Sequence, residues 1–237
     1  MKDLELPAGL TIFSGAKRTG KTRFALQWAN YLAQKSKTLF IAWGNYEAKL
    51  IDELCDMNDS ISEELTIDTQ YDYLDTNTFI DIYKQIEGED YKIVFFDNIQ
   101  YSQYNNLSFY DKNSDIALPN ILEFIADKLS VKVVLVTEVN VVFRFEPKFM
   151  MYPSINNFTF PQHIINKSAQ IYYLHLIISN EVKKKEDVLL LLKEIQIHCI
   201  KNVQNEDYIL KYDNEKLTLI SAKMLLKHFS TYDSNIV

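Results

Sequence analysis

The chain has 237 residues, 47% of them hydrophobic, and it carries a formal net charge of −7 at pH 7 with an isoelectric point near 5.2. The length and apolar content predict one domain over 1–237, which ends in a loose tail at 230–237. The acidic balance argues against a dedicated nucleic-acid-binding protein, and because no apolar run approaches the roughly 20 residues of a membrane span, we expect a cytoplasmic protein without a membrane partner.

The first predicted element is a short apolar strand at residues 10–13, and it leads into Gly15-Ala16-Lys17-Arg18-Thr19-Gly20-Lys21-Thr22. This octapeptide has the G-x-x-x-x-G-K-[ST] pattern of a phosphate-binding loop. A helix is predicted directly after it, because apolar residues recur there on one face: Phe24, Ala25, Trp28, Ala29 and Leu32. A chance glycine turn would not require a strand before it and a helix after it.

In such a loop the backbone N–H groups surround an anion, and the following helix directs its positive end at the phosphates. Lys21 then reaches the terminal phosphate oxygens as a catalytic residue, and the Thr22 hydroxyl faces Mg²⁺. We therefore predict that ATP and Mg²⁺ are the cofactors. The predicted nucleotide contacts are Gly15, Ala16, Lys17, Arg18, Thr19, Gly20, Lys21, Thr22 and Arg23.

Strands and helices alternate through the middle of the chain. A strand is predicted at 38–43, a helix at 47–57, a weak strand at 64–68, a helix at 76–86 with a threonine or aspartate cap, and a strong strand at 91–97. This alternation predicts a parallel sheet.

A polar loop follows at 102–115, then a helix at 116–129 and a strand at 131–137. The last third is predicted to form strands in hairpins, with a charged turn and a short final helix. In order, these elements are a strand at 169–178, the turn at 179–187, strands at 193–201, 207–212 and 216–221, and the helix at 222–228. The predicted fold class is α/β, with a mostly parallel twisted sheet flanked by helices and with C-terminal β-hairpins.

Asp97 ends the strong strand, after four large apolar residues. An aspartate at a strand end is also a common turn residue or helix cap, but a phosphate loop upstream favours a role in the magnesium site together with Thr22. Hydrolysis also needs a carboxylate that orients or deprotonates water. Asn98, not a glutamate, follows Asp97, so the candidates for this base are Glu47 and Glu138.

The order of these segments resembles the RecA-type ATPase core, and within it the helicase domain of DnaB-like replicative helicases, with KaiC-like proteins next. The resemblance covers residues 7–221 and includes the segments 7–15, 39–43, 93–100, 133–140 and 194–202. It implies a P-loop fold, ATP hydrolysis, contact with single-stranded DNA and assembly into a homo-oligomer or with a protein partner. Within this pattern the phosphate loop is the specific motif.

Two positions depart from the family's pattern. The strand at 39–43 is followed by Gly44 and Asn45, where the resemblance implies a catalytic glutamate, and Glu47 comes two or three residues later. The segment 203–205 lacks the arginine that would reach a neighbouring subunit's nucleotide. Arginine occurs at only three positions in the chain: Arg18, Arg23 and Arg144. Because a general base and an arginine finger each contribute orders of magnitude in rate, we expect weak hydrolysis.

Two loops, 102–115 and 142–167, are candidates for contact with single-stranded DNA. The second combines Arg144, Lys148 and Lys167 with several aromatic residues, which stack on bases while cations follow the phosphates. A packed loop or a subunit contact is the alternative for both. The sequence thus favours a DNA-associated ATPase. Its alternative is a nucleotide-gated interaction protein with vestigial ATPase activity and no helicase function.

Overall fold

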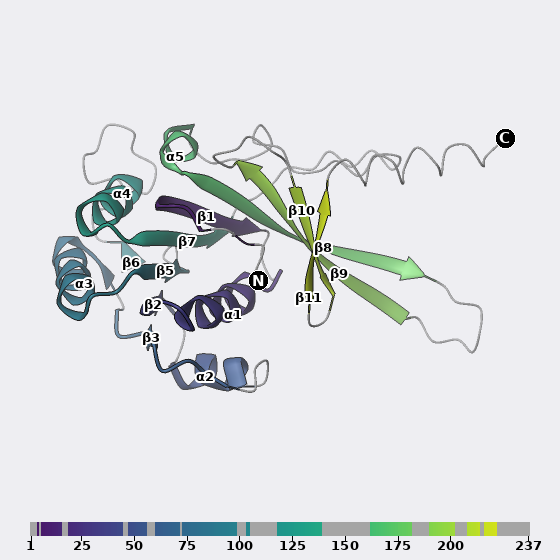
Figure 1. Ribbon diagram of the computed structural model, residues 1–237, viewed down its shortest axis with the longest axis horizontal. Helices are drawn as coiled ribbons and strands as arrows, with labels where there is room; N and C mark the ends of the chain where they lie inside the picture. Colours follow the sequence, from purple (N-terminus) through teal and green to yellow (C-terminus); the bar gives the residue numbers. More distant parts are fainter. Residues whose placement is uncertain are drawn as a thin grey trace.

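The computed structural model describes residues 4, 6–15, 19–44, 47–55, 60–71, 73–98, 103–104, 118–138, 162–181, 190–201, 208–213 and 216–221. These residues form one nine-stranded sheet, a separate pair of short strands, and helices on both faces of the sheet (Figure 1). The parallel α/β class with C-terminal hairpins is confirmed.

Six strands of the large sheet run parallel, in the order β8-β1-β7-β5-β2-β3. Three further strands continue it antiparallel beyond β8, in the order β9, β10, β11. The strand bounds are β1 (Gly9–Gly15), β2 (Thr38–Ala42), β3 (Leu65–Asp68), β5 (Ile93–Asp97), β7 (Lys132–Glu138), β8 (Gln170–Glu181), β9 (Leu190–Lys201), β10 (Tyr208–Asp213) and β11 (Lys216–Ser221).

Helices cover both faces of the parallel strands, so these strands are apolar on both sides. Phe95 of β5 packs in a cluster with α1 and α2, whereas its neighbours Val94 and Phe96 pack in a second cluster with α3 and α4. The helices are α1 (Lys21–Ala33), α2 (Glu47–Cys55), α3 (Thr76–Glu89), α4 (Leu118–Leu129) and α5 (Gln162–Lys167). None of the described helices is long and apolar enough to pass through a bilayer.

Trp28 fixes α1 against the middle of the sheet. Its fully buried indole meets Phe13 of β1, Phe95 of β5 and Tyr172 of β8 edge-on, at ring-centroid separations of 6.0, 5.6 and 5.8 Å. Edge-to-face pairs of this kind add to the free energy that burial already contributes. One side chain therefore holds α1 to three strands.

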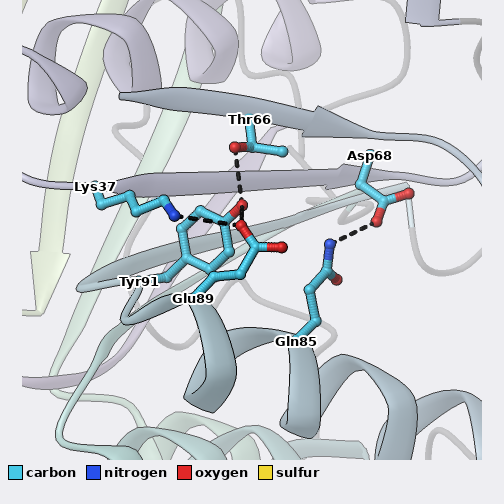
Figure 2. A network of polar contacts seen from close by, with 6 residues as sticks. All are labelled: Lys37, Thr66, Asp68, Gln85, Glu89 and Tyr91. Carbon is cyan, nitrogen blue, oxygen red and sulfur yellow. Dashed lines mark hydrogen bonds and ion pairs between the residues drawn. The ribbon is translucent and has the colours of Figure 1, made fainter. Parts of the chain in front are cut away.

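A polar network ties α3 to the strands at the edge of the sheet (Figure 2). Asp75 caps the helix by accepting a 2.8 Å hydrogen bond from the Thr78 N–H, which confirms the predicted aspartate cap. Gln85 of α3 donates to Asp68, the last residue of β3, at 3.0 Å. The Tyr91 hydroxyl lies 2.8 Å from the Thr66 hydroxyl and 2.9 Å from the Glu89 carboxylate.

The C-terminal strands are present, but the turn predicted at 179–187 starts too early. Strand β8 continues to Glu181, because it pairs with β9 residue by residue up to the Glu181 and Leu190 partners. A polar end on a long hairpin strand has the composition of a turn, and only the partner strand distinguishes the two. The predicted helix at 222–228 and the tail at 230–237 lie outside the described residues.

Three elements were not predicted. Strands β4 (Tyr73–Leu74) and β6 (Gln103–Tyr104) form a two-residue parallel pair, and α5 is a helix of six residues. The segments 102–115 and 142–167 are therefore not loops throughout, which corrects the sequence analysis. Elements this short have no measurable hydrophobic period, so periodicity cannot predict them.

Candidate nucleotide site

Gly15 and Asp97, two residues of the predicted nucleotide site, lie at the carboxyl end of the parallel strands. In the strand registers Gly15 of β1 is the partner of Glu138 of β7, and Asp97 of β5 is the partner of Val136. Asp97 is also the partner of Ala42, at the end of β2. Open parallel sheets bind their ligands at this edge. The sheet order β1-β7-β5 therefore brings Asp97 to the same edge as Gly15, two strands away.

The two loop glycines are needed for different reasons. A Cβ atom on Gly15 would lie 2.8 Å from the Leu174 carbonyl oxygen, 3.0 Å from the Thr19 hydroxyl and 3.2 Å from the Lys21 side chain. Gly20, by contrast, has nothing within 4 Å of such an atom, but its φ of 88° is in the left-handed region. Gly15 therefore provides space, and Gly20 provides a backbone conformation that other residues adopt at a cost.

Helix α1 begins at Lys21, near the end of the predicted phosphate-binding motif. Gly20 is the N-cap and has no side chain with which to cap the helix, and no acidic residue lies in the first turn. The first N–H groups of a helix have no intrahelical acceptor and carry partial positive charge. Lys21, which is buried, adds a full positive charge at the same point. This end of the helix can therefore attract a phosphate.

Asp97 is fully buried, and its two carboxylate oxygens differ. Oδ2 accepts a 3.0 Å hydrogen bond from the Asn98 amide nitrogen, whereas Oδ1 has no hydrogen-bond partner. The same amide nitrogen lies 3.3 Å from the Thr22 hydroxyl oxygen. A buried acceptor without a donor is costly in a folded protein. Asp97 is therefore a buried carboxylate with one oxygen left for a ligand.

Burial raises the pKa of Asp97 to about 7, and three neighbours oppose this rise: the Thr22 side chain, the Lys21 charge and the Asn98 backbone N–H. A divalent cation beside the unpaired oxygen would favour the ionised carboxylate further. Carboxylate and hydroxyl oxygens are the ligands that Mg²⁺ takes in proteins. The side chains of Thr22 and Asp97 thus fit a magnesium ion.

The other predicted loop residues are only partly described. Ala16, Lys17 and Arg18 lie outside the described residues, Thr19 is next to Gly15, and Arg23 is exposed on α1.

Neither candidate base is shown to reach the phosphates. Glu47 is exposed at the start of α2, and Asn45, which precedes it by two residues, lies outside the described residues. Glu138 ends β7 next to Gly15 in the register, and only its backbone is described. Both remain predictions.

Trp43 forms part of the core. It is buried and stacks on Phe96 at 6.2 Å, and its backbone N–H donates to the Asp97 carbonyl at 3.1 Å. Gly44 then turns the chain with a φ of 70°.

The candidate DNA loops are largely outside the described residues, with β6 and α5 as the described exceptions. Arg144 and the segment 203–205 lie outside them as well. Lys167 of α5 forms an ion pair with Glu123 of α4, so its ammonium group binds a neighbouring helix.

Sequence analysis missed Asn98 as a site residue and noted it only as the absence of a glutamate. Its side chain joins Thr22 to Asp97, and its backbone has a φ of 58°. An asparagine directly after a buried strand is a recognisable signal, because asparagine tolerates the left-handed region better than most residues.

No family model matches the sequence, and no curated protein matches it. Solved structures do match the fold. One is described as an ATPase domain, with a TM-score of 0.63 and 15% identity over 90% of this chain and 84% of that one. Another is a DnaB-like replicative helicase, described with its interactions with primase, with a TM-score of 0.61 and 13% identity.

The second match covers 89% of this chain and 57% of the helicase chain, so this protein spans little more than half of that helicase's length. Identities this low establish the fold and nothing finer. The RecA-type P-loop fold, shared with the ATPase domains of DnaB-like helicases, is confirmed.

Proposed function

We propose that this protein is a DNA-associated ATPase with a RecA/DnaB-like P-loop core, which binds Mg·ATP and hydrolyses it weakly. The observation that carries the proposal is that a helix N-terminus with a glycine cap lies at the same edge of the sheet as a buried carboxylate, one oxygen of which makes no hydrogen bond. Gly20, which has no side chain, is the N-cap of α1, and Asp97 Oδ1 at the same edge of the sheet has no hydrogen-bond partner.

Each residue then has a defined task. Backbone N–H groups of the loop and of the first turn of α1 bind the phosphates, and Lys21 neutralises charge on them. Thr22 and Asp97 hold the magnesium ion, which when bound offsets the charge that develops on the phosphate oxygens. Gly15 lets the loop lie against β8 without a clash. ATP binding therefore uses groups that the fold already brings together.

The weak step in this scheme is the activation of water. Glu47 is exposed at the start of α2, beyond the turn at Gly44, and a base acts only within hydrogen-bond reach of the proton it takes. Glu47 and Glu138 are the proposed bases, and we expect slow turnover from either.

The association with DNA rests on the fold and on the candidate loops. Segments 102–115 and 142–167 are proposed to contact single-stranded DNA, with a second copy of the chain or another protein as partner. The proposed contact with DNA rests on analogy between folds, whereas proposed nucleotide binding rests on side-chain geometry.

The exposed position of Glu47 favours a second candidate function. Without a base in reach, the protein would bind ATP and not turn it over, and its ATP-bound state would recruit a partner. In this alternative the ATPase activity is vestigial and there is no helicase function.

Calorimetry with ATP, with and without Mg²⁺, tests the nucleotide site. We expect Mg²⁺ to strengthen binding to the wild-type protein and to have little effect on Asp97→Asn, which removes the charge that holds the cation. Asp81→Asn, an exposed aspartate on α3, is the matched control and should behave as wild type. No heat of association in the wild-type protein would refute the proposed function.

Steady-state ATPase assays with and without single-stranded DNA separate the two candidate functions. Stimulation by DNA supports the DNA-associated ATPase, whereas tight binding without turnover supports the interaction protein. Glu47→Gln and Glu138→Gln then identify the base, because loss of the charge should lower turnover by about 10²-fold or more at the residue that activates water. If turnover is present and survives both changes, neither glutamate is the base.

A further inference from the structure

Asn98 adopts a backbone conformation that places its side chain over the edge of the sheet. It directly follows β5, its φ is 58°, and its side chain is half-buried. A positive φ is unfavourable for a residue that carries a Cβ atom, and it is less unfavourable for asparagine than for most other residues. A contact of the side chain can offset that cost.

The contact is a bridge between the two proposed magnesium ligands. The Asn98 amide nitrogen lies 3.0 Å from Asp97 Oδ2 and 3.3 Å from the Thr22 hydroxyl oxygen. The nitrogen end of the amide faces these oxygens, and its N–H groups donate to both of them. A group with partial positive charge thus lies between two oxygen-bearing side chains.

We propose that the Asn98 amide competes with the magnesium ion for the Thr22 hydroxyl oxygen and for the space beside Asp97. The inference rests on the proposed function, because it concerns the same cation site. Without a cation, the two N–H groups hold the oxygens together. A cation held by the Thr22 hydroxyl and Asp97 Oδ1 displaces the amide, because an N–H donor and a cation repel each other at the Thr22 oxygen that both contact.

The proposed competition predicts the direction in which cation affinity and protein stability change when the amide is removed. Removing the amide should make the cation easier to bind, and it should make the cation-free protein less stable. A residue that supports the cation would have the opposite effect on binding. A competing role and a supporting role of Asn98 therefore predict opposite changes in the affinity for the cation.

Asn98→Gly removes the amide, and glycine adopts a positive φ without a steric penalty. Ser130→Gly is the matched control, because Ser130 also has a positive φ, 52°, and is exposed after α4, on an element that does not supply the site. Both changes relieve the same backbone cost, and only the first removes the bridge. Asn98→Asp is a second variant, since aspartate also tolerates this conformation and brings a carboxylate in place of the donor.

The first measurement is the Mg²⁺ concentration that gives half of the maximal strengthening of ADP binding. We expect it to fall about three- to tenfold in Asn98→Gly, the range for one or two ordinary hydrogen bonds that no longer compete. It should fall further in Asn98→Asp and stay unchanged in Ser130→Gly. A rise in Asn98→Gly, or no change, would overturn the proposal.

The second measurement needs no nucleotide. In the presence of a chelator, the thermal midpoint of Asn98→Gly should lie below that of Ser130→Gly, because only the former has lost a contact. Equal midpoints would show that the bridge contributes nothing. If the wild-type protein fails to bind nucleotide at any Mg²⁺ concentration, the proposed function fails, and this comparison still decides whether the bridge exists.

Discussion

A methyl group on Gly15 would meet the Leu174 carbonyl oxygen at 2.8 Å. That oxygen belongs to the backbone of β8, a neighbour of β1 in the sheet, so it cannot turn away as a flexible side chain can. The motif identifies Gly15 from the sequence, but the atom that excludes a larger residue comes from a strand about 160 residues later in the chain.

We predict that Gly15→Ala lowers the free energy of unfolding by about 1–3 kcal/mol, the usual range for a group forced into a packed site. The displaced loop should also bind ATP at least about tenfold more weakly, a loss of 1.4 kcal/mol or more. Chemical denaturation and calorimetry measure the two effects.

Gly88→Ala is the control for this substitution. Gly88 lies in α3 with nothing within 4 Å of an added Cβ atom, and alanine favours helices over glycine by about 0.5–1 kcal/mol. This variant should be at least as stable as wild type and should bind ATP normally. If Gly15→Ala behaves in the same way, the close approach to Leu174 does not restrict the loop.

At the scale of the elements, α3 depends on polar contacts with the strands as well as on its apolar face. Tyr91 precedes β5, and its buried ring carries a hydroxyl that joins Thr66 of β3 to Glu89 at the end of α3 (Figure 2). The Lys37 ammonium lies 4.7 Å from the centre of the same ring and pairs with Glu89 at 3.2 Å. The network thus connects a helix with the start of three strands.

We predict that Tyr91→Phe lowers the free energy of unfolding by about 1–2 kcal/mol, because it leaves the Thr66 hydroxyl without its partner. Tyr83→Phe is the control: Tyr83 is a partly buried tyrosine of α3 whose ring packs against Phe124 at 6.2 Å. Urea denaturation at pH 7 compares the two variants. An equal loss in both would mean that the Tyr91 hydroxyl contributes nothing specific.

The same residue predicts a dependence on alkaline pH. Burial, with the neighbouring Glu89, raises the pKa of Tyr91 from 10.0 to about 12, so between these values the folded protein holds a proton that the unfolded chain has lost. Stability from this group is complete below pH 10 and falls as the pH rises toward 12. The stability of Tyr91→Phe should fall less over this range than that of wild type, and parallel curves would contradict the assignment.

At the scale of the whole molecule, the order of the strands assembles the site. Strand β1 passes through α1 to β2, which lies beyond β7 and β5, whereas β7 leads to β8 on the opposite side of β1 (Figure 1). The connections that leave the neighbouring strands β1 and β7 therefore run in opposite directions along the sheet. In an open parallel sheet a crevice forms at the carboxyl edge at such a point. Loop and carboxylate meet there although more than 70 residues separate them.

Because the site exists only in the folded chain, ligand binding should stabilise the whole domain. A ligand at a hundred times its dissociation constant adds about 2.7 kcal/mol to the free energy of unfolding. We predict that Mg·ATP raises the thermal midpoint of wild type by several degrees and that Lys21→Ala abolishes the shift. Lys49→Ala, an exposed lysine on α2, should retain it. A full shift in Lys21→Ala would place the nucleotide elsewhere.

The local features of this protein could be predicted from its amino-acid sequence. The glycine and lysine pattern at 15–22, the helical spacing after it and the apolar run into Asp97 are physical requirements of short segments, and they predicted the loop, α1 and the end of β5. The alternation of strands and helices predicted a parallel sheet for the same reason. Very short elements such as β4 and α5 were missed, because two to six residues do not define a hydrophobic period.

Which distant residues meet became visible in the folded chain. The strand order places Asp97 at the same edge as Gly15, and the position of β8 makes the space at Gly15 too small for a side chain. The bridge from Asn98 to Thr22 joins residues 76 positions apart. Contacts of this kind depend on the packing of whole elements, and no local pattern of residues encodes them.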